Sequence, residues 1–218
     1  MRRSSLGGVL LLLCLGSGLH AEELPDYIAA ANECPGSPKT CLGLHLYVAV
    51  DNDGPVADSA WVSAQIANAN RLFAALDTGF AVVAAETLPK ESAHIATRTD
   101  RDLLGRTRWT AGNIHVFVTG RLDNVDEEGE IYGVHWRDRK QTSHRWVILS
   151  ARSWSHTLVH ELGHFFGLPH STEPTSIMTK GAPDPVPAGQ RVFTGSQQRK
   201  MVERLKKKLR RKTLKTSD

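Results

Sequence analysis

The run from His160 to His170, HELGHFFGLPH, constrains this 218-residue chain more than any other feature. His160 and His164 are four residues apart, so on a helix their imidazoles project from one face toward a common point. Gly167 follows where such a helix must end, because a residue without Cβ can enter the left-handed conformation and turn the backbone sharply. We expect that turn to bring His170 beneath the helix, beside the other two histidines.

Three neutral imidazoles in this arrangement predict a site for one zinc ion, with His160, His164 and His170 as the metal ligands. One coordination position is left for water, whose pKa zinc lowers from 15.7 toward about 7. Glu161 points away from the ligands and can accept the proton of that water as general base. A lone HExxH also occurs in helices that bind nothing, but the added glycine and third histidine favour a zinc-dependent hydrolase of internal peptide bonds.

The motif resembles that of the metzincin clan of zinc endopeptidases, in which a tight turn places a methionine beneath the metal. Met178 fits that turn; it follows His170 by eight residues, and Ser171 comes directly after the third histidine, as in the matrixin branch. The resemblance implies an α+β (mixed α/β) fold. Its parts would be a small twisted mixed sheet with an antiparallel edge strand, an active-site helix and a C-terminal helix. The alternative for Met178 is a flexible core filler.

The chain also departs from the family pattern. No matrixin-type cysteine switch and no upstream His/Asp cluster for a structural zinc is seen in the sequence, so we expect a single zinc ion. Lys180 stands two residues after Met178, where astacins and serralysins resemble one another in having a tyrosine that stabilises the transition state. Lys180 is a candidate for that role, against the alternative of a solvated surface lysine.

Residues 1–21 have the features of a secretory signal peptide: a positive start at Arg2 and Arg3, a short leucine-rich stretch and small residues near Ala21. The stretch is too short and too interrupted by glycine for a membrane span, so the mature chain should have no transmembrane segment. A lipoprotein anchored through Cys14 is disfavoured by Leu13, and paired arginines only weakly allow twin-arginine export. We expect an exported protein, either secreted or periplasmic.

Residues 22–43 form an N-terminal segment that contains Cys34 and Cys41, the two cysteines left after the signal is removed. An even pair at short separation in an exported chain predicts a disulfide. The alternative, in which Cys34 blocks the zinc as a latency switch, is disfavoured because a partner thiol lies seven residues away.

The catalytic domain is expected over residues 44–209. Alternating apolar residues predict strands at 44–50, 80–86, 114–118, 131–136 and 145–149, and one apolar face predicts a helix over 62–76. Residues 90–108 give no clear prediction. The order suggests a mixed sheet with helices packed on one side and the metal helix crossing beneath it.

Within the resemblance, the strand at 131–136 would be the edge strand that borders the cleft. An extended substrate could then add to that edge through backbone hydrogen bonds, with Gly133 allowing close approach. The loop from 173 to 193 should wall the pocket for the residue after the scissile bond. His135 and His144 lie near this region, but a histidine outside a ligand motif is more often structural.

Two charge clusters remain. The acidic residues before the edge strand suggest a Ca2+ site as an alternative to a solvated acidic loop; they are Asp123, Asp126, Glu127, Glu128 and Glu130. The last twenty residues contain ten basic and two acidic side chains, a charge of +8 in a chain of +4, so the rest carries −4. We expect a closing helix over 196–209 and a basic C-terminal tail at 210–218.

A basic tail on an acidic body can tether a protein to an anionic surface or polymer. The alternative function is therefore a secreted envelope- or polyanion-binding protein with a structural or vestigial zinc site. An intact Glu161 argues against it, because a structural zinc site has no use for a base. We expect a monomer that acts on a protein or peptide substrate and has no specific nucleic-acid partner.

Overall fold

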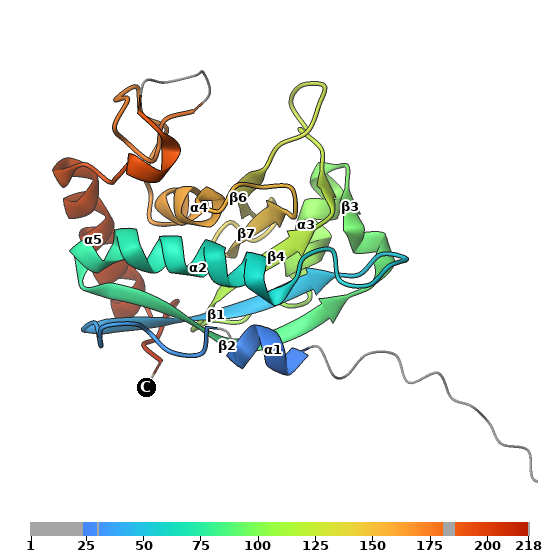
Figure 1. Ribbon diagram of the computed structural model, residues 1–218, viewed down its shortest axis with the longest axis horizontal. Coiled ribbons are helices and arrows are strands. Elements are labelled where there is room, and N and C mark those ends of the chain that lie inside the picture. The colour runs from blue at the N-terminus through green and yellow to red at the C-terminus, as the bar shows by residue number, and fades with distance from the viewer. Residues whose placement is uncertain (1–23, 30, 181–185, 218) are drawn as a thin grey trace, which may run out of the picture.

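A five-stranded mixed sheet organises the computed structural model, which describes residues 24–29, 31–180 and 186–217 (Figure 1). Its strand order is β2-β1-β4-β7-β6; the first four strands run parallel, and β6 is antiparallel to β7. The predicted α+β fold with an antiparallel edge strand is confirmed. The strands are β1 (Thr40–Ala49), β2 (Thr78–Leu88), β4 (Ile114–Thr119), β6 (Gly133–Arg137) and β7 (Arg145–Ser150).

The central strands are buried on both faces. In β1, Leu44, Leu46 and Val48 enter the larger apolar cluster, while Tyr47 enters a second cluster on the opposite side of the sheet. Successive side chains of a strand point to opposite faces, so buried apolar residues on both faces require a layer on each side.

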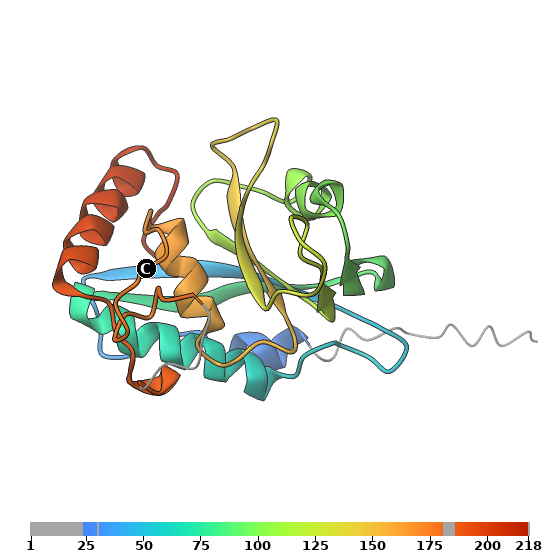
Figure 2. The same ribbon diagram turned by 90° about the horizontal axis from the view of Figure 1, so that it is seen from above.

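Helices α2 (Ser59–Phe73) and α4 (Thr157–Phe165) cover one face of the sheet, and α5 (Gly195–Arg210) packs beside them (Figures 1 and 2). Helix α2 begins after Asp58, whose side chain accepts a hydrogen bond from the Trp61 N–H at 2.7 Å. The buried amide of Gln65 then accepts from the Leu158 N–H at 3.0 Å, which ties α2 to the start of α4. This contact fixes the helix that carries the zinc motif against the core.

The opposite face is covered by α3 (Arg98–Arg106), so the expectation that helices pack on one side only was wrong. A capping box starts this helix: Thr97 and Asp100 each bind the other's backbone N–H. Gly105 packs directly on Trp146, where a Cβ would come within 2.4 Å of the indole ring. Before and after α3 lie η2 (Lys90–Ala93) and the short paired strands β3 (His94–Ile95) and β5 (Arg121–Leu122).

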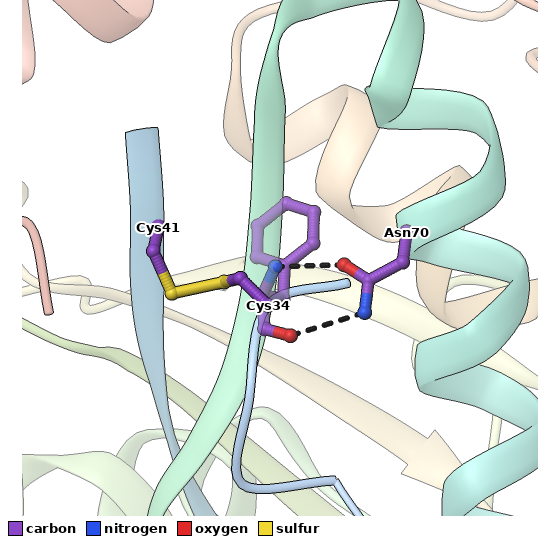
Figure 3. Close-up of a disulfide and its surroundings, with 4 residues drawn as sticks. Cys34, Cys41 and Asn70 are labelled. Atoms are coloured by element: carbon purple, nitrogen blue, oxygen red, sulfur yellow. Dashed lines mark hydrogen bonds between the residues drawn. A yellow bond between two sulfur atoms is a disulfide. The ribbon is translucent and has the colours of Figure 1, made fainter. Parts of the chain in front are cut away.

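A disulfide joins Cys34 to Cys41 at the start of β1, as predicted (Figure 3). Beside it the Asn70 side chain binds both backbone groups of Phe80 in β2, at 2.7 and 3.1 Å. The short helix α1 (Leu24–Ala29) precedes the disulfide. The predicted signal peptide, 1–21, lies outside the described residues. Among the residues described, no helix is long and apolar enough to cross a membrane.

The C-terminal residues do not form the separate tail that was expected at 210–218. After α5 the chain returns to the sheet: the Ser217 N–H donates to the Cys41 carbonyl at 2.8 Å, and the Lys215 N–H donates to that of Gly112 at 2.9 Å. Leu214 is 2% exposed and belongs to the main core. One well-placed leucine and a few backbone bonds are therefore enough to hold this segment on the domain.

Candidate metal centre

Helix α4 carries the first part of the zinc motif and ends where the sequence predicts. Gly167 has φ 89°, a left-handed conformation that favours glycine. The Gly167 N–H donates to the carbonyl of His164 at 2.9 Å, and the Leu168 N–H donates to that of Gly163 at 3.0 Å. These two bonds close the helix and reverse the chain, so that His170 returns toward α4.

The turn brings the three predicted ligands together. The Nε2 atom of His164 lies 3.1 Å from that of His160 and 3.2 Å from that of His170. The Nδ1 atom of His160 lies 2.8 Å from the carbonyl oxygen of Ile177, and that of His164 lies 2.7 Å from the carbonyl oxygen of Leu168. A carbonyl only accepts, so Nδ1 carries the proton in both rings and Nε2 is left as a lone pair.

This tautomer pattern tests whether a cation fits the site. Two unprotonated Nε2 atoms cannot form a hydrogen bond with each other, so their 3.1 Å approach brings together lone pairs that repel unless a cation lies between them. Tetrahedral ligands at a Zn–N distance of 2.0–2.1 Å lie about 3.3 Å apart, close to the observed spacing. Burial lowers the pKa of His160 to about 4, with His164 and His170 acting in the same direction. The triad therefore fits zinc in spacing, tautomer and charge.

The methionine turn packs against α4 beside the triad. Met178 is fully buried, its N–H donates to the Ser176 hydroxyl at 3.1 Å, and its carbonyl accepts from the Ser171 N–H at 2.9 Å. The preceding residue, Ile177, supplies the carbonyl that binds His160. The turn thus orients a candidate ligand through its backbone, which is how partners around a metal site fix ligand geometry.

Glu161 lies beside the triad and is 6% exposed. Burial raises the pKa of Glu161 to about 8, while a hydrogen bond from the His135 backbone and the charge of Arg101 act in the opposite direction. A carboxyl group whose pKa lies near neutrality is well suited both to take up and to release a proton.

A cavity of about 770 Å³ opens over these residues, and its lining includes His160, Glu161, His164 and His170. Strand β6, at the edge of the sheet, forms part of the border of this cavity. A Cβ on Gly133 would lie 2.6 Å from Thr157 Cγ2 and 3.1 Å from Glu161 Cγ, so glycine lets β6 pack closely against α4. The exposed side chain of Lys180 also lines the cavity.

The two other histidines near the edge strand differ in position. His135 lines the cavity and packs edge-on against Phe165, with ring centroids 5.8 Å apart. His144 stacks on Trp109 at 3.7 Å. In the described parts of the chain, a search for three or more His, Cys, Asp or Glu residues close enough to share a metal ion finds one group, the triad.

The structure does not support the calcium prediction for the acidic loop. Its carboxylates face cations of the protein: Asp123 pairs with Arg121 at 2.7 Å, and Glu130 pairs with Arg152 at 3.2 Å. Asp126 pairs with Arg98. These ion pairs give the acidic residues a partner without a metal.

Sequence reasoning missed two charged residues of the cavity lining, Arg101 of α3 and Arg191. Residues 90–108 gave no periodic pattern, but the Thr97 to Asp100 spacing is a signal for a helix start that could have placed Arg101 on a helix.

Comparison with known proteins agrees with this geometry. The family model described as Matrixin, Peptidase_M10, matches residues 67–186. A search of curated protein sequences finds no match. Among solved structures, an archaemetzincin from Methanopyrus kandleri is similar with a TM-score of 0.54 and 17% identity, over 79% of this chain and 98% of that one. Metalloproteinase-II from Bacteroides fragilis gives a TM-score of 0.52 and 15% identity, over 80% of this chain and 55% of that one.

Proposed function

Because the chain belongs to the matrixin family of zinc metallopeptidases, we propose that it is an exported endopeptidase that cleaves internal peptide bonds of proteins. The observation that carries the proposal is the convergence of three imidazole nitrogens beside a buried carboxylate, in a cavity that the open edge of the sheet borders. In this proposal His160, His164 and His170 hold the zinc ion and Glu161 is the general base.

Different groups of the protein have different roles in the proposed reaction. The backbone carbonyls of Ile177 and Leu168 keep His160 and His164 in the tautomer that can bind a metal. When bound, zinc would supply a Lewis acid that polarises the scissile carbonyl and lowers the pKa of a water molecule. Glu161 would take a proton from the attacking water molecule as the oxygen of the water bonds to the carbonyl carbon. Glu161 then gives the proton to the nitrogen that leaves when the C–N bond breaks.

Strand β6 offers the means of holding a substrate. It is the terminal strand and pairs only with β7 among the described strands, so an extended peptide could add to its outer edge by main-chain hydrogen bonds, beside the His135 N–H that already binds Glu161. Gly133 brings this edge close to Glu161, so a peptide paired with β6 would pass over the proposed base. A long unfolded segment suits such a site better than a compact ligand.

The experiment that tests the chemistry compares the zinc-loaded parent with Glu161→Ala on a quenched-fluorescence peptide library. The variant should keep one zinc per chain by elemental analysis, because no ligand is removed, and lose about 10²- to 10⁴-fold in kcat. Glu203→Gln, an exposed carboxylate on α5, serves as the charge-matched control and should behave as the parent. Equal rates in the parent and Glu161→Ala would overturn the mechanism.

Export is supported by the sequence of residues 1–21 and by the Cys34–Cys41 disulfide, since such bonds persist in oxidising compartments. Intact-mass analysis of the protein recovered from outside the producing cytoplasm should show a chain that begins near Glu22. A full-length mass in that fraction would argue against signal cleavage.

A second activity is favoured by the charge of α5 and the residues after it. The side chains of Lys206, Lys207 and Arg210 are exposed, and none forms an ion pair with a carboxylate in the part of the chain that the structure describes. We propose that this basic surface attaches the enzyme to an anionic polymer or membrane surface. Truncation of the C-terminal residues is not a clean test of this proposal, because it would remove Leu214 from the core and damage the domain.

A further inference from the structure

Arg101 is a buried arginine at the wall of the cavity that contains the histidine triad. It is 2% exposed, and its guanidinium lies 5.0 Å from the centre of the Trp136 ring. One terminal nitrogen donates to the Asp123 carbonyl at 2.6 Å, while Nε is buried without a partner. A guanidinium has five N–H groups, so most of its hydrogen-bonding capacity is unused within the described residues.

Arg101 also has no counter-ion there. It forms no ion pair with a carboxylate of the described residues, and burial lowers its pKa even though Asp126 and Glu161 act in the opposite direction. The acidic side chains of the neighbouring loop are paired elsewhere, Asp126 with Arg98 and Glu130 with Arg152. A buried charge is costly unless it is paired, and a buried arginine with free donors beside a cavity is suited to an incoming carboxylate.

The position of Arg101 relative to β6 places it within reach of a bound peptide. Gly133 and His135 of β6 face α4, whereas Trp136 packs with the cluster under α3, and Arg101 lies over the Trp136 ring. A peptide paired with the β6 edge would turn alternate side chains toward these two faces. One side chain near the scissile bond would then point toward Arg101.

We propose that Arg101 is the residue of this site that selects the substrate, by binding a carboxylate of the peptide close to the scissile bond. This inference rests on the proposed function and names its substrate class, acidic peptides. The carboxylate can come from an Asp or Glu side chain or from the free C-terminus of a short peptide, because both present the same planar pair of oxygens to the guanidinium.

The first experiment scans a blocked, C-terminally amidated peptide with Glu, and with Gln at the same places, across three positions on each side of the cleaved bond. The zinc-loaded parent should prefer Glu over Gln by at least about tenfold in kcat/KM at one position, as expected for a charge-assisted pair. A second arm compares free and amidated C-termini on short peptides and identifies that source if the preference appears there instead. No preference in either arm overturns the inference.

The second experiment repeats the scan with Arg101→Gln, which removes the charge and keeps part of the side chain's length. The ratio of Glu to Gln peptides should fall toward one, whereas Arg199→Gln, which loses an exposed arginine of α5, should keep the parental ratio. An unchanged ratio in Arg101→Gln overturns the assignment. If Arg101→Gln does not fold, Arg101→Lys tests the same point, because a point charge without the planar fork should reduce the preference.

Failure of this inference can be told apart from failure of the proposed function. Calorimetry on zinc-loaded Glu161→Ala measures binding of the Glu and Gln peptides without turnover. Tighter binding of the Glu peptide that disappears in the Glu161→Ala, Arg101→Gln double variant supports the inference even if no peptide is cleaved by the parent. Cleavage by the parent with equal binding of both peptides retains the function and overturns the inference.

Discussion

The sulfur of Met178 occupies the space that a side chain on Gly163 would need: a Cβ on Gly163 would lie 2.3 Å from Met178 Sδ. Gly163 lies one residue before the proposed ligand His164, and Met178 lies in the turn whose backbone binds His160. The metal helix and the methionine turn are therefore in direct contact at a point where no additional atom fits.

Gly163→Ala should disturb the site more than its small size suggests. Overpacking of a filled core costs about 1–3 kcal/mol, and the shift of the turn should also lower zinc affinity. Thermal unfolding and competition with a zinc chelator measure the two effects. Gly189→Ala is the control, since nothing lies within 4 Å of its Cβ position. Equal stability and equal zinc affinity in both variants would show that the turn yields easily.

Leu214→Ala should destabilise the domain by about 2–5 kcal/mol, the usual range for a leucine buried in a core. The reason is that Leu214 is 2% exposed although it lies in the chain's basic C-terminal region. Leu103→Ala, in which the residue replaced is 53% exposed, should change the free energy of unfolding little. Denaturant titration of both variants checks this, and a neutral Leu214→Ala would restore the idea of a separate tail.

Replacing both Cys34 and Cys41 by Ser should lower the free energy of unfolding by on the order of 2–3 kcal/mol, because the bridge closes a short loop. Neither cysteine lines the cavity that contains the triad, so the zinc content should not change. The parent unfolded in the presence of a reductant should match the double variant. A double variant as stable as the oxidised parent would mean that the native bridge is strained.

Acid should destabilise the protein partly through His135. Burial, the largest cause, and nearby cations lower the pKa of His135 to about 3, whereas an unfolded histidine has a pKa near 6.5. As pH falls below 6.5 the unfolded state takes up this proton first, so the stability present above pH 6.5 is lost progressively toward pH 3. His135→Phe should therefore lose less in Tm between pH 7 and pH 5 than the parent, both measured with zinc bound. A larger Tm loss in the variant would contradict this assignment.

The triple variant Lys206→Gln, Lys207→Gln, Arg210→Gln should elute from an immobilised polyanion at lower salt than the parent. The attraction of exposed cations is screened as the Debye length shortens from about 10 Å at 0.1 M to 3 Å at 1 M. The matched control replaces three exposed cations elsewhere with Gln, namely Arg71, Lys90 and Lys140. Equal shifts in both triple variants would indicate attraction by net charge alone, without a defined surface.

Much of the sheet could be predicted because its strands carry their pattern locally. The alternation at 114–118 and 145–149 predicts β4 and β7 within one residue of their ends. The position of α3 could not be predicted this way. Leu104 is the one large apolar residue that this helix buries, and its other close contact is made by Gly105 with Trp146, which is distant in the sequence. Its location depends on tertiary contacts that no local period encodes.

The candidate site likewise contains residues that the sequence predicts and a residue that it does not. His160, Glu161, His164 and His170 lie within eleven residues, so helix geometry and one turn are sufficient to predict that they meet. Arg101 lies sixty residues from Glu161 and reaches the cavity only because α3 packs against β6. Side chains that come from a separate element have no spacing signature, even when they face the same cavity.

The open edge of β6 has a consequence for the enzyme in concentrated solution. Backbone groups that can accept an extended peptide can also pair with the edge of another copy, which is a common route to aggregation. This strand is only five residues long and ends at the exposed Arg137, which stands opposite Arg145 of β7. Two such edges brought together would set like charges side by side, so copies of the protein should remain apart while an unfolded chain can still enter.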